Sequence, residues 1–170
     1  ASENEISDKI ISGLEVDQFG NVWVYTPYEY LWRYYGLWRY DGQTWHRYEG
    51  LGGPLALDLQ KNLLAVDSSL YASNDQFRIV SFNGSEFVYR WRSKFHAKSY
   101  AIGLACIAQD SKGNPWISYY CDRSGDTYGV VCNNTLYNTL DGLADDNVRS
   151  ITPGESGTVW CATDGGISKF

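Results

Sequence analysis

The residues best suited to binding chemistry form an aromatic cluster early in the chain. Positions 27–35 hold five aromatic side chains and one arginine within nine residues. Aromatic rings stack on the C–H faces of sugars, while nearby polar and charged groups hydrogen-bond the sugar hydroxyls. The segment therefore predicts a site for a carbohydrate or a similar small polar ligand. Its candidate ligand-binding residues are Tyr28, Tyr30, Trp32, Arg33 and Tyr34.

A second segment with the same mixture of side chains follows near position 122. Its candidates are Asp122, Arg123, Asp126 and Tyr128. Both segments also fit a structural role. The aromatic residues of the first can pack over a sheet edge or extend a long hairpin, and the second can be a solvated hairpin tip. Both alternatives stay open at the level of sequence.

Catalytic groups are harder to find. The two histidines, His46 and His96, have no serine or cysteine partner at a recognisable spacing, and a catalytic histidine needs an orienting group and a nucleophile. Four aspartates recur at what we interpret as equivalent turn positions, where they cap turns rather than do chemistry. They are Asp17, Asp41, Asp110 and Asp141. We therefore expect a protein that is not an enzyme and needs no cofactor.

The cysteines do not show the spacing of a metal site. Cys106, Cys121, Cys132 and Cys161 all fall in predicted strands, without a Cys-x-x-Cys pair, so we expect no bound metal. Two interpretations remain. Cys121 and Cys132 flank one strand connection and can pair as a disulfide if their strands align, or all four can be buried free thiols.

The elements that position these segments follow from an internal repeat. A phrase built around tryptophan occurs at 20–26, 113–119 and 157–163. Trp23 and Trp116 are 93 positions apart, and Trp116 and Trp160 are 44 apart. The first gap fits two units and the second fits one, which places the missing unit near 56–93. Short strands repeating every 40 to 45 residues or so are typical of β-propeller blades.

Two further landmarks support this period. Gly36–Gly42 recurs loosely as Phe77–Gly84, then at Gly129–Asn133 and Gly166–Phe170. Glu49–Leu51 matches Asp141–Leu143, 92 positions on. Alternation of apolar residues predicts strands at 11–17, 22–26, 36–40 and 44–48, and again at 102–109, 115–120, 128–132 and 135–140. Pro115 fits only as the first residue of its strand.

The predicted fold class is therefore all-β, with about four propeller blades of four antiparallel strands in residues 1–170. The blades run roughly over 6–50, 51–97, 98–143 and 144–170. The last lacks its outer strand, which leaves an exposed sheet edge. Either the chain is a piece of a larger propeller, which we favour, or residues 1–7 supply the missing strand. We expect the repeated tryptophans to pack between blades.

These motifs resemble the two-component-regulator propeller repeat. The match is carried by Asp-x-x-Gly-Asn-x-Trp-x-x-Thr, Gly-Leu-Trp-Arg-Tyr-Asp-Gly-x-x-Trp, Asp-Gly-Leu and Val-x-x-Ile, found at 17–45, 110–116, 141–143 and 148–170. Blade two matches poorly, because Ser69–Asn74 stands where its second-strand tryptophan is expected. The resemblance implies a seven-bladed propeller in the extracytoplasmic sensor of a bacterial membrane histidine kinase, often tied to carbohydrate sensing. Four blades are too few for that whole module.

Composition limits the partners. A net charge of −6 argues against nucleic acid, which needs a basic surface. No apolar run approaches the ~20 residues of a membrane span, so this segment is expected to have no membrane contact of its own. Ala1-Ser2 fits a start left by signal-peptide removal, and we expect a periplasmic or secreted location. The basic cluster Arg90, Trp91, Arg92 and Lys94 fits a solvated strand end, or a contact with an acidic glycan or neighbouring domain.

Two functional hypotheses remain. The first is a sensor module that binds a carbohydrate or other small polar ligand without transforming it and changes how the propeller sits on other blades or sensor domains. The second is a protein interaction scaffold, which can self-associate through the open edge of the last blade. An enzyme ranks third, because no acid–base pair stands out.

Overall fold

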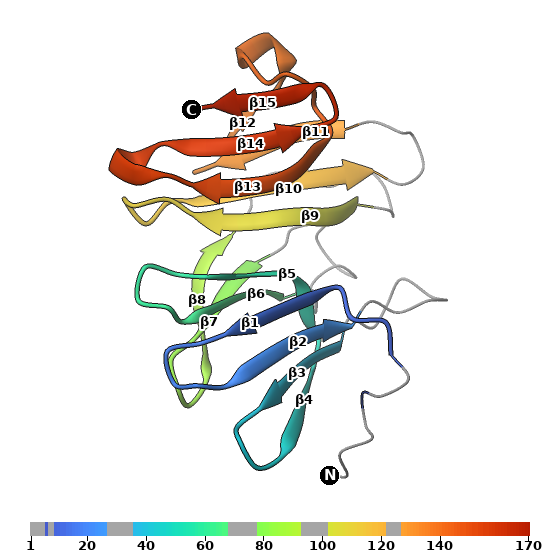
Figure 1. The fold of residues 1–170 in the computed structure, drawn as a ribbon, viewed down its shortest axis with the longest axis vertical. Coiled ribbons are helices and arrows are strands. Elements are labelled where there is room, and N and C mark those ends of the chain that lie inside the picture. Colours follow the sequence, from blue (N-terminus) through green and yellow to red (C-terminus); the bar gives the residue numbers. More distant parts are fainter. Residues whose placement is uncertain (1–5, 7–8, 27–35, 68–77, 93–101, 122–126) are drawn as a thin grey trace. The chain divides into compact units, whose positions relative to one another are not determined.

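The computed structural model describes residues 6, 9–26, 36–67, 78–92, 102–121 and 127–170, with the side chains of 102–105, 119–121, 127 and 128 left out. The chain is all-β and folds as β-propeller blades, each an antiparallel sheet (Figure 1). Among these described residues, three sheets have four strands and the last has three. The predicted fold class, including the incomplete last blade, is confirmed. The chain forms two compact units, residues 1–92 and 93–170.

The first unit contains two four-stranded sheets. The first is ordered β1-β2-β3-β4 and the second β5-β6-β7-β8, so each strand pairs with its neighbour in sequence. The strands of the first sheet are β1 (Gly13–Val16), β2 (Val22–Thr26), β3 (Gly36–Tyr40) and β4 (Trp45–Glu49). Those of the second are β5 (Leu51–Leu57), β6 (Leu63–Asp67), β7 (Arg78–Phe82) and β8 (Phe87–Arg92).

The second unit contains the third and fourth sheets. The third sheet comprises β9 (Ile102–Gln109), β10 (Pro115–Cys121), β11 (Thr127–Cys132) and β12 (Thr135–Tyr137). The short 3-10 helix η1 (Thr139–Asp141) follows it. The fourth sheet comprises β13 (Val148–Pro153), β14 (Val159–Thr163) and β15 (Gly166–Lys169), with the 3-10 helix η2 (Glu155–Gly157) before β14. Pro115 begins its strand, as predicted.

One turn motif joins the first two strands of three sheets. The Asp17 carboxylate accepts hydrogen bonds from the backbone N–H groups of Phe19 and Asn21, from the Asn21 side chain and from the Trp23 indole. Asp110 repeats this pattern at Lys112, Asn114 and Trp116, at 2.9 to 3.1 Å. The aspartate thus holds the turn and fixes the tryptophan at once, which explains their constant spacing of six residues.

The second sheet uses the same turn with different residues, and the sequence interpretation of this blade was wrong. Asp58 accepts hydrogen bonds from Gln60 and Asn62 as Asp17 does from its neighbours. Its second strand is β6, so the tryptophan position is taken by Leu64, and Ser69–Asn74 lies outside the described residues. The Ser81 hydroxyl donates to Asp58 at 3.4 Å, on the oxygen corresponding to the one that binds the indole in the first sheet.

The four aspartates assigned to equivalent turns do not share one position. Asp17 and Asp110 hold the turn between the first two strands, whereas Asp41 holds the turn between β3 and β4 through the N–H groups of Gln43 and Thr44. Asp141 belongs to the capping box of η1, where its carboxylate accepts from the N–H of Asn138. Their role in capping turns is confirmed, but their equivalence was an error, and Asp58 is the missing member of the first set.

Aromatic packing fills the core of the first unit. Trp23 is fully buried, and its ring centroid lies 4.9 Å from Phe82 and 5.5 Å from both Tyr48 and Phe87. Leu37, Leu63, Ala65 and Val80 belong to the same cluster. The tryptophan side of the first sheet therefore packs on the side of the second sheet that lies opposite Leu64, as expected for tryptophans between blades.

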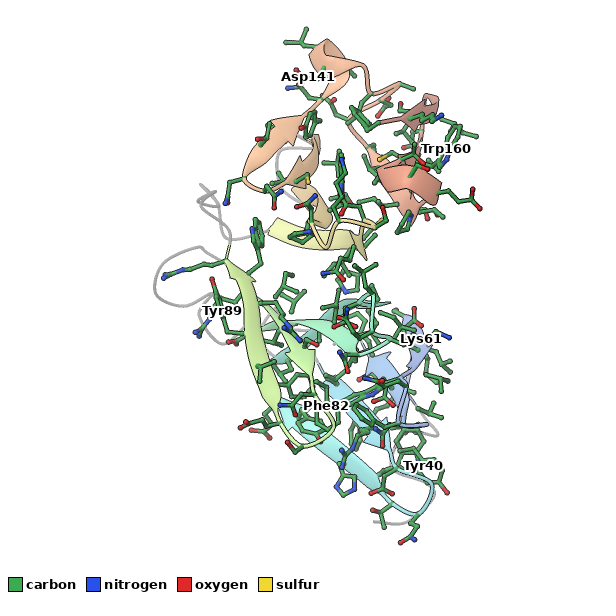
Figure 2. All side chains as sticks on the ribbon, turned by 90° about the vertical axis from the view of Figure 1, so that its left-hand side faces the viewer. Tyr40, Lys61, Phe82, Tyr89, Asp141 and Trp160 are labelled. Carbon is green, nitrogen blue, oxygen red and sulfur yellow. The ribbon has the colours of Figure 1, made fainter. Side chains whose placement is uncertain are left out.

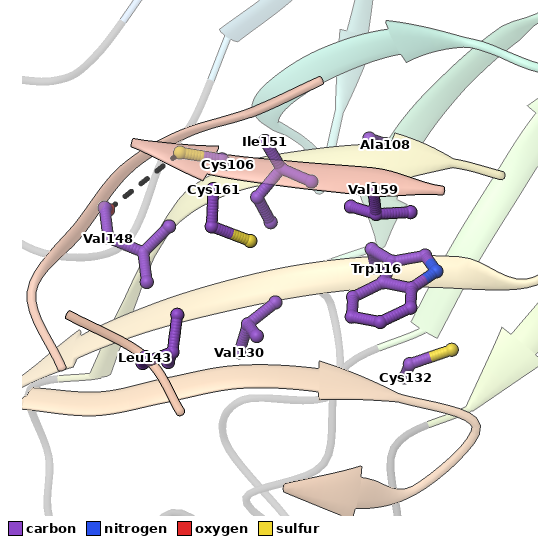
Figure 3. Close-up of a cluster of buried hydrophobic side chains, with 10 residues drawn as sticks. All are labelled: Cys106, Ala108, Trp116, Val130, Cys132, Leu143, Val148, Ile151, Val159 and Cys161. Carbon is purple, nitrogen blue, oxygen red and sulfur yellow. Dashed lines mark hydrogen bonds between the residues drawn. The ribbon is translucent and has the colours of Figure 1, made fainter. Parts of the chain in front are cut away.

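The core of the second unit is also built around a tryptophan, and Figure 3 draws Trp116 with the small and aliphatic side chains around it. Trp116 packs beside Tyr137 and Phe170, with ring centroids 5.7 and 5.8 Å away. The rest of the cluster consists of small and aliphatic side chains: Cys106, Ala108, Val130, Cys132, Leu143, Val148, Ile151, Val159 and Cys161. The tryptophan side of the third sheet thus packs on the fourth sheet.

The third tryptophan of the repeat differs from the other two in its exposure. Trp160, labelled in Figure 2, lies on the fourth sheet. It is 43% exposed, whereas Trp23 is fully buried and Trp116 nearly so. In its turn Gly154 replaces the aspartate, and a Cβ atom there would lie 3.2 Å from the Trp160 indole nitrogen. Within the second unit no described strand covers its side of the fourth sheet. Packing between blades is therefore confirmed for Trp23 and Trp116 and stays a prediction for Trp160.

Candidate functional site

The predicted binding residues fall almost entirely outside the described part of the chain. Tyr28, Tyr30, Trp32, Arg33 and Tyr34 lie in 27–35, and Asp122, Arg123 and Asp126 lie in 122–126. Tyr128 belongs to β11, but its side chain is not described. The structure does describe the strands that flank both segments.

The first segment connects the ends of two paired strands. Thr26 ends β2, Gly36 begins β3, and the two residues are paired across the ladder. The Thr26 hydroxyl donates a hydrogen bond to the Gly36 carbonyl oxygen at 3.3 Å. A Cβ atom at Gly36 would lie only 2.6 Å from Thr26 Oγ1, so a larger residue there would force the Thr26 side chain to move. The two residues that flank the segment are therefore held side by side in the sheet.

Trp38 places an unused hydrogen-bond donor at this base. Its ring is buried, and its indole Nε1 has no hydrogen-bond partner. This nitrogen would lie 3.0 Å from a Cβ atom at Gly36, so it sits where the segment rejoins the sheet. Lys9 and Arg47 lie over the ring, 5.9 and 5.6 Å from its centroid. Buried donors normally have partners, so Trp38 is a candidate that sequence reasoning missed, although the Gly36–Gly42 landmark contains it.

The frame of the second segment is less regular. Strand β10 ends at Cys121 and β11 begins at Thr127, and the ladder between them shifts register between Ser118 and Tyr120. Irregularities of this kind are common beside functional sites, where they redirect side chains. Ser118, at the start of this shift, is buried and pairs across the ladder with Cys106 and Val130 of the core cluster.

His46 has an orienting carboxylate that the sequence did not reveal. Its Nε2 lies 2.6 Å from Asp41 Oδ2, and the Thr44 hydroxyl lies 3.1 Å from the same nitrogen. Hydrogen bonds from the Thr44 backbone, His46 and the Gln43 backbone hold the pKa of Asp41 well below its ordinary value. A catalytic relay needs the acid and the nucleophile on different ring nitrogens, so this arrangement fits a braced hairpin better than a catalytic dyad. His96 lies outside the described residues.

The basic cluster is partly tied to the turn of its own sheet. Arg90 is exposed and lies on β8, where its guanidinium reaches the buried Asp58 carboxylate at 3.9 Å. Lys94 lies outside the described residues. The prediction of a solvated strand end is therefore incomplete, because Arg90 also places a positive charge near the buried carboxylate of Asp58.

Three cysteines are buried free thiols. Cys106, Cys132 and Cys161 carry no disulfide, which matches the second interpretation for these three and leaves Cys132 unpaired with Cys121. Burial raises the pKa of Cys132 and of Cys161 to about 11. Among the described residues, no three His, Cys, Asp or Glu side chains gather as metal ligands would.

No known family model matches this sequence, and no curated protein matches it either. Solved structures do match, over nearly the whole chain. The extracellular domain of a proposed hybrid two-component system from B. thetaiotaomicron gives a TM-score of 0.60 at 15% identity, covering 94% of this chain and 21% of that one. PorZ, a surface component of the type-IX secretion system of Porphyromonas gingivalis, gives 0.53 at 15% identity, covering 94% and 25%.

Structures named as enzymes match to a similar degree. A proposed gluconolactonase gives a TM-score of 0.55 at 14% identity, covering 94% of this chain and 57% of its own. This chain thus spans between about a fifth and three fifths of the proteins it resembles. At such identities the likeness establishes the propeller fold. No helix among the described residues is long and apolar enough to cross a membrane.

Proposed function

We propose that this chain is part of an extracytoplasmic sensor propeller of the two-component-regulator type. In this role it binds a carbohydrate or similar small polar ligand and does not transform it. The observation that carries the proposal is the repeated Asp-to-Trp turn of blades one and three, which belongs to the motif resembling that repeat. The likeness of 94% of the chain to an extracellular two-component domain supports the same reading.

The proposed ligand site lies on the segment between β2 and β3. Its five aromatic residues and Arg33 supply stacking surfaces and a charged donor. The unused indole N–H of Trp38 at the base supplies a fixed donor for a ligand hydroxyl. Asp122, Arg123, Asp126 and Tyr128 would contribute from the segment between β10 and β11.

The proposed signal is a change in how the propeller sits on neighbouring blades or sensor domains when ligand binds. A ligand shifts such an equilibrium only if it binds one arrangement more tightly. A site on an insertion between two core strands suits this role, because the strands remain fixed while the insertion contacts both ligand and neighbour.

The absence of a catalytic role is also a proposal, since a proposed gluconolactonase shares the fold. It is supported by His46, whose Nε2 is held by Asp41 and Thr44 together. Folds host many activities, so the site rather than the likeness carries this argument.

The test is a printed array of neutral and acidic oligosaccharides, probed with the wild-type chain and with a variant carrying Tyr30→Ala, Trp32→Ala and Tyr34→Ala. Tyr89→Ala, an exposed aromatic change on β8, is the matched control. We expect binding by the wild type and the control and its loss in the triple variant with circular dichroism unchanged. Equal binding by the triple variant would refute the site, and no binding by the wild type would refute the carbohydrate ligand.

A further inference from the structure

Three charged side chains lie in a row on one side of the second sheet. Asp67 ends β6 and Arg78 begins β7, and the two residues pair across the ladder. Arg78 also pairs with Arg92, which ends β8. Residues paired in this way point to the same side of an antiparallel sheet, with Cβ atoms about 5 Å apart. We call Arg78 and Arg92 the arginine pair of blade two.

A bulge in β8 brings Arg92 to the side of Arg78. Val80 of β7 pairs with Tyr89 of β8. Arg78 lies two residues before Val80, but its partner Arg92 lies three residues after Tyr89, so β8 holds one extra residue. Strict alternation from Tyr89 would turn Arg92 to the other side of the sheet. Bulges re-aim side chains in this way and are common beside functional sites.

The side of the second sheet that carries the arginine pair also packs on the first sheet. Phe82 lies four positions after Arg78 on β7, hence on the same side, and belongs to the core cluster around Trp23. Leu51, which pairs with Asp67, packs against the same cluster. The arginine pair therefore lies at the margin of the packed surface between two sheets of the first unit.

The charges of the arginine pair are only partly balanced. Asp67 contacts the Arg78 guanidinium at one nitrogen, Nη2, at 3.1 Å. The Arg78 Nε is buried and has no hydrogen-bond partner among the described residues. Arg92 is exposed and forms no ion pair with any described carboxylate. Like charges directly opposite one another destabilise a sheet, so a second anion is favoured at this pair.

The arginine pair lies at the end of its blade that corresponds to the proposed sugar site. In the second sheet, Asp67 and Arg78 flank the connection between the second and third strands. In the first sheet, Thr26 and Gly36 flank the same connection, which holds the proposed aromatic ligand residues. An acidic sugar offers rings to aromatic residues and a carboxylate to arginines, which bind carboxylates through parallel N–H donors.

We propose that the arginine pair of blade two binds the carboxylate group of an acidic sugar. The Arg78 guanidinium is held by Asp67 at the margin of the core and supplies a positioned positive charge. Arg92 lies opposite Arg78 in solvent and supplies a second fork of N–H donors. The inference rests on the proposed sugar-binding function and narrows its ligand to acidic oligosaccharides.

The test is calorimetric titration of the chain with short oligogalacturonates and with the methyl esters of the same oligosaccharides. Esterification keeps the sugar rings and removes their charge. The variants are Arg78→Gln, Arg92→Gln and Asp67→Asn. Lys112→Gln is the matched control, because it removes a positive charge from the exposed turn between β9 and β10. A glutamate oligopeptide distinguishes a sugar acid from other carboxylates.

We expect the wild type and the control to bind the acid about tenfold or more tightly than the ester, the effect of one hydrogen bond between charged groups. Arg78→Gln and Arg92→Gln should lose this preference with circular dichroism unchanged. Arg92→Gln keeps the contact between Arg78 and Asp67, so it decides the question if Arg78→Gln does not fold. Asp67→Asn should bind the acid more tightly, because a competing carboxylate is removed. Loss of a purely structural ion pair would not give that gain.

The possible failures are distinguishable. Equal affinity for acid and ester, or an unchanged preference in Arg92→Gln, would overturn the arginine pair and leave the sugar-binding function intact. Binding of the glutamate peptide as tightly as the sugar acid would overturn the sugar as the source of the carboxylate. A wild type that binds neither oligosaccharide would overturn this inference, and the oligosaccharide array then decides whether the proposed function fails with it.

Discussion

Replacing Asp110 by asparagine tests the turn that positions Trp116. In the wild type, Oδ1 accepts from the N–H groups of Lys112 and Asn114, while Oδ2 accepts from the Asn114 side chain and the Trp116 indole. Asparagine has one oxygen and one NH2 group. In either orientation two N–H donors therefore face another donor, in a site where the aspartate is only 3% exposed.

The expected cost follows from those two donors. A buried donor left without an acceptor costs about 1–3 kcal/mol, and part of the cost is relieved by movement of the turn, so we expect a loss of about 3 kcal/mol in the free energy of unfolding. For a chain of this size each kcal/mol lowers Tm by about 2–4 °C, which gives a fall of about 9 °C. Asp164→Asn is the matched control, because Asp164 is exposed and pairs with Arg149 at the surface.

The same variant predicts a pH dependence. Burial alone would raise the pKa of Asp110, but hydrogen bonds from Asn114, Trp116 and Lys112 outweigh burial and hold this pKa below its ordinary value. A lowered pKa in the folded state gives stability that is present above the ordinary aspartate pKa and is lost as the pH falls through the folded pKa. The difference between wild type and Asp110→Asn should therefore be largest near neutral pH and shrink in acid.

The assay is denaturant unfolding followed by circular dichroism and tryptophan fluorescence, at neutral pH and at stepwise lower pH. Equal stability of Asp110→Asn and the wild type at neutral pH would refute the argument that this carboxylate holds the turn. A difference that grows in acid would refute the sign of the linkage.

Two further predictions follow from local geometry. The buried thiols Cys132 and Cys161, whose pKa values are raised to about 11, should not react with Ellman's reagent at mildly alkaline pH, because the thiolate is the nucleophile. All four cysteines should react in denaturant. Rapid reaction of more than one cysteine in the native chain would contradict the described core. Gly129→Ala should lower Tm more than Gly42→Ala. Both glycines have a positive φ, which costs about 1–2 kcal/mol when alanine adopts it. Only at Gly129 would the added Cβ atom also meet the backbone, because it would lie very close to the Tyr137 carbonyl oxygen. Equal Tm values would show that the β12 backbone yields freely.

Several strand positions were predictable from the glycine and tryptophan landmarks of the repeat and from the alternation of apolar residues. The strands at 22–26, 36–40 and 102–109 match the predicted bounds. Blade two was misread because the interpretation followed tryptophan rather than aspartate. Asp58 and Asn62 keep the spacing of Asp17 and Asn21, and Lys61 adopts the positive φ that Gly20 has in the first turn. The turn needs the carboxylate and the conformation, not the particular side chains, so a search for Asp-x-x-x-Asn would have found it.

The candidate site was predictable only in its position along the chain. An insertion between the second and third strands is visible as extra length, but the donor at its base is not. Whether the Trp38 indole has a partner depends on packing around Gly36 and Thr26 in three dimensions. The same holds for Trp160, whose exposure depends on which strands cover its side of the sheet rather than on its own motif.

The most direct test of the proposed sensor function is retention of oligosaccharides by the immobilised chain, with mass spectrometry of what is retained and released. The account predicts that the wild-type chain retains a defined subset and releases it unchanged in mass, and that the Tyr30, Trp32 and Tyr34 alanine variant retains none of it. Shortened or modified glycans in the eluate, or equal retention by the variant, would contradict a non-catalytic site on this insertion.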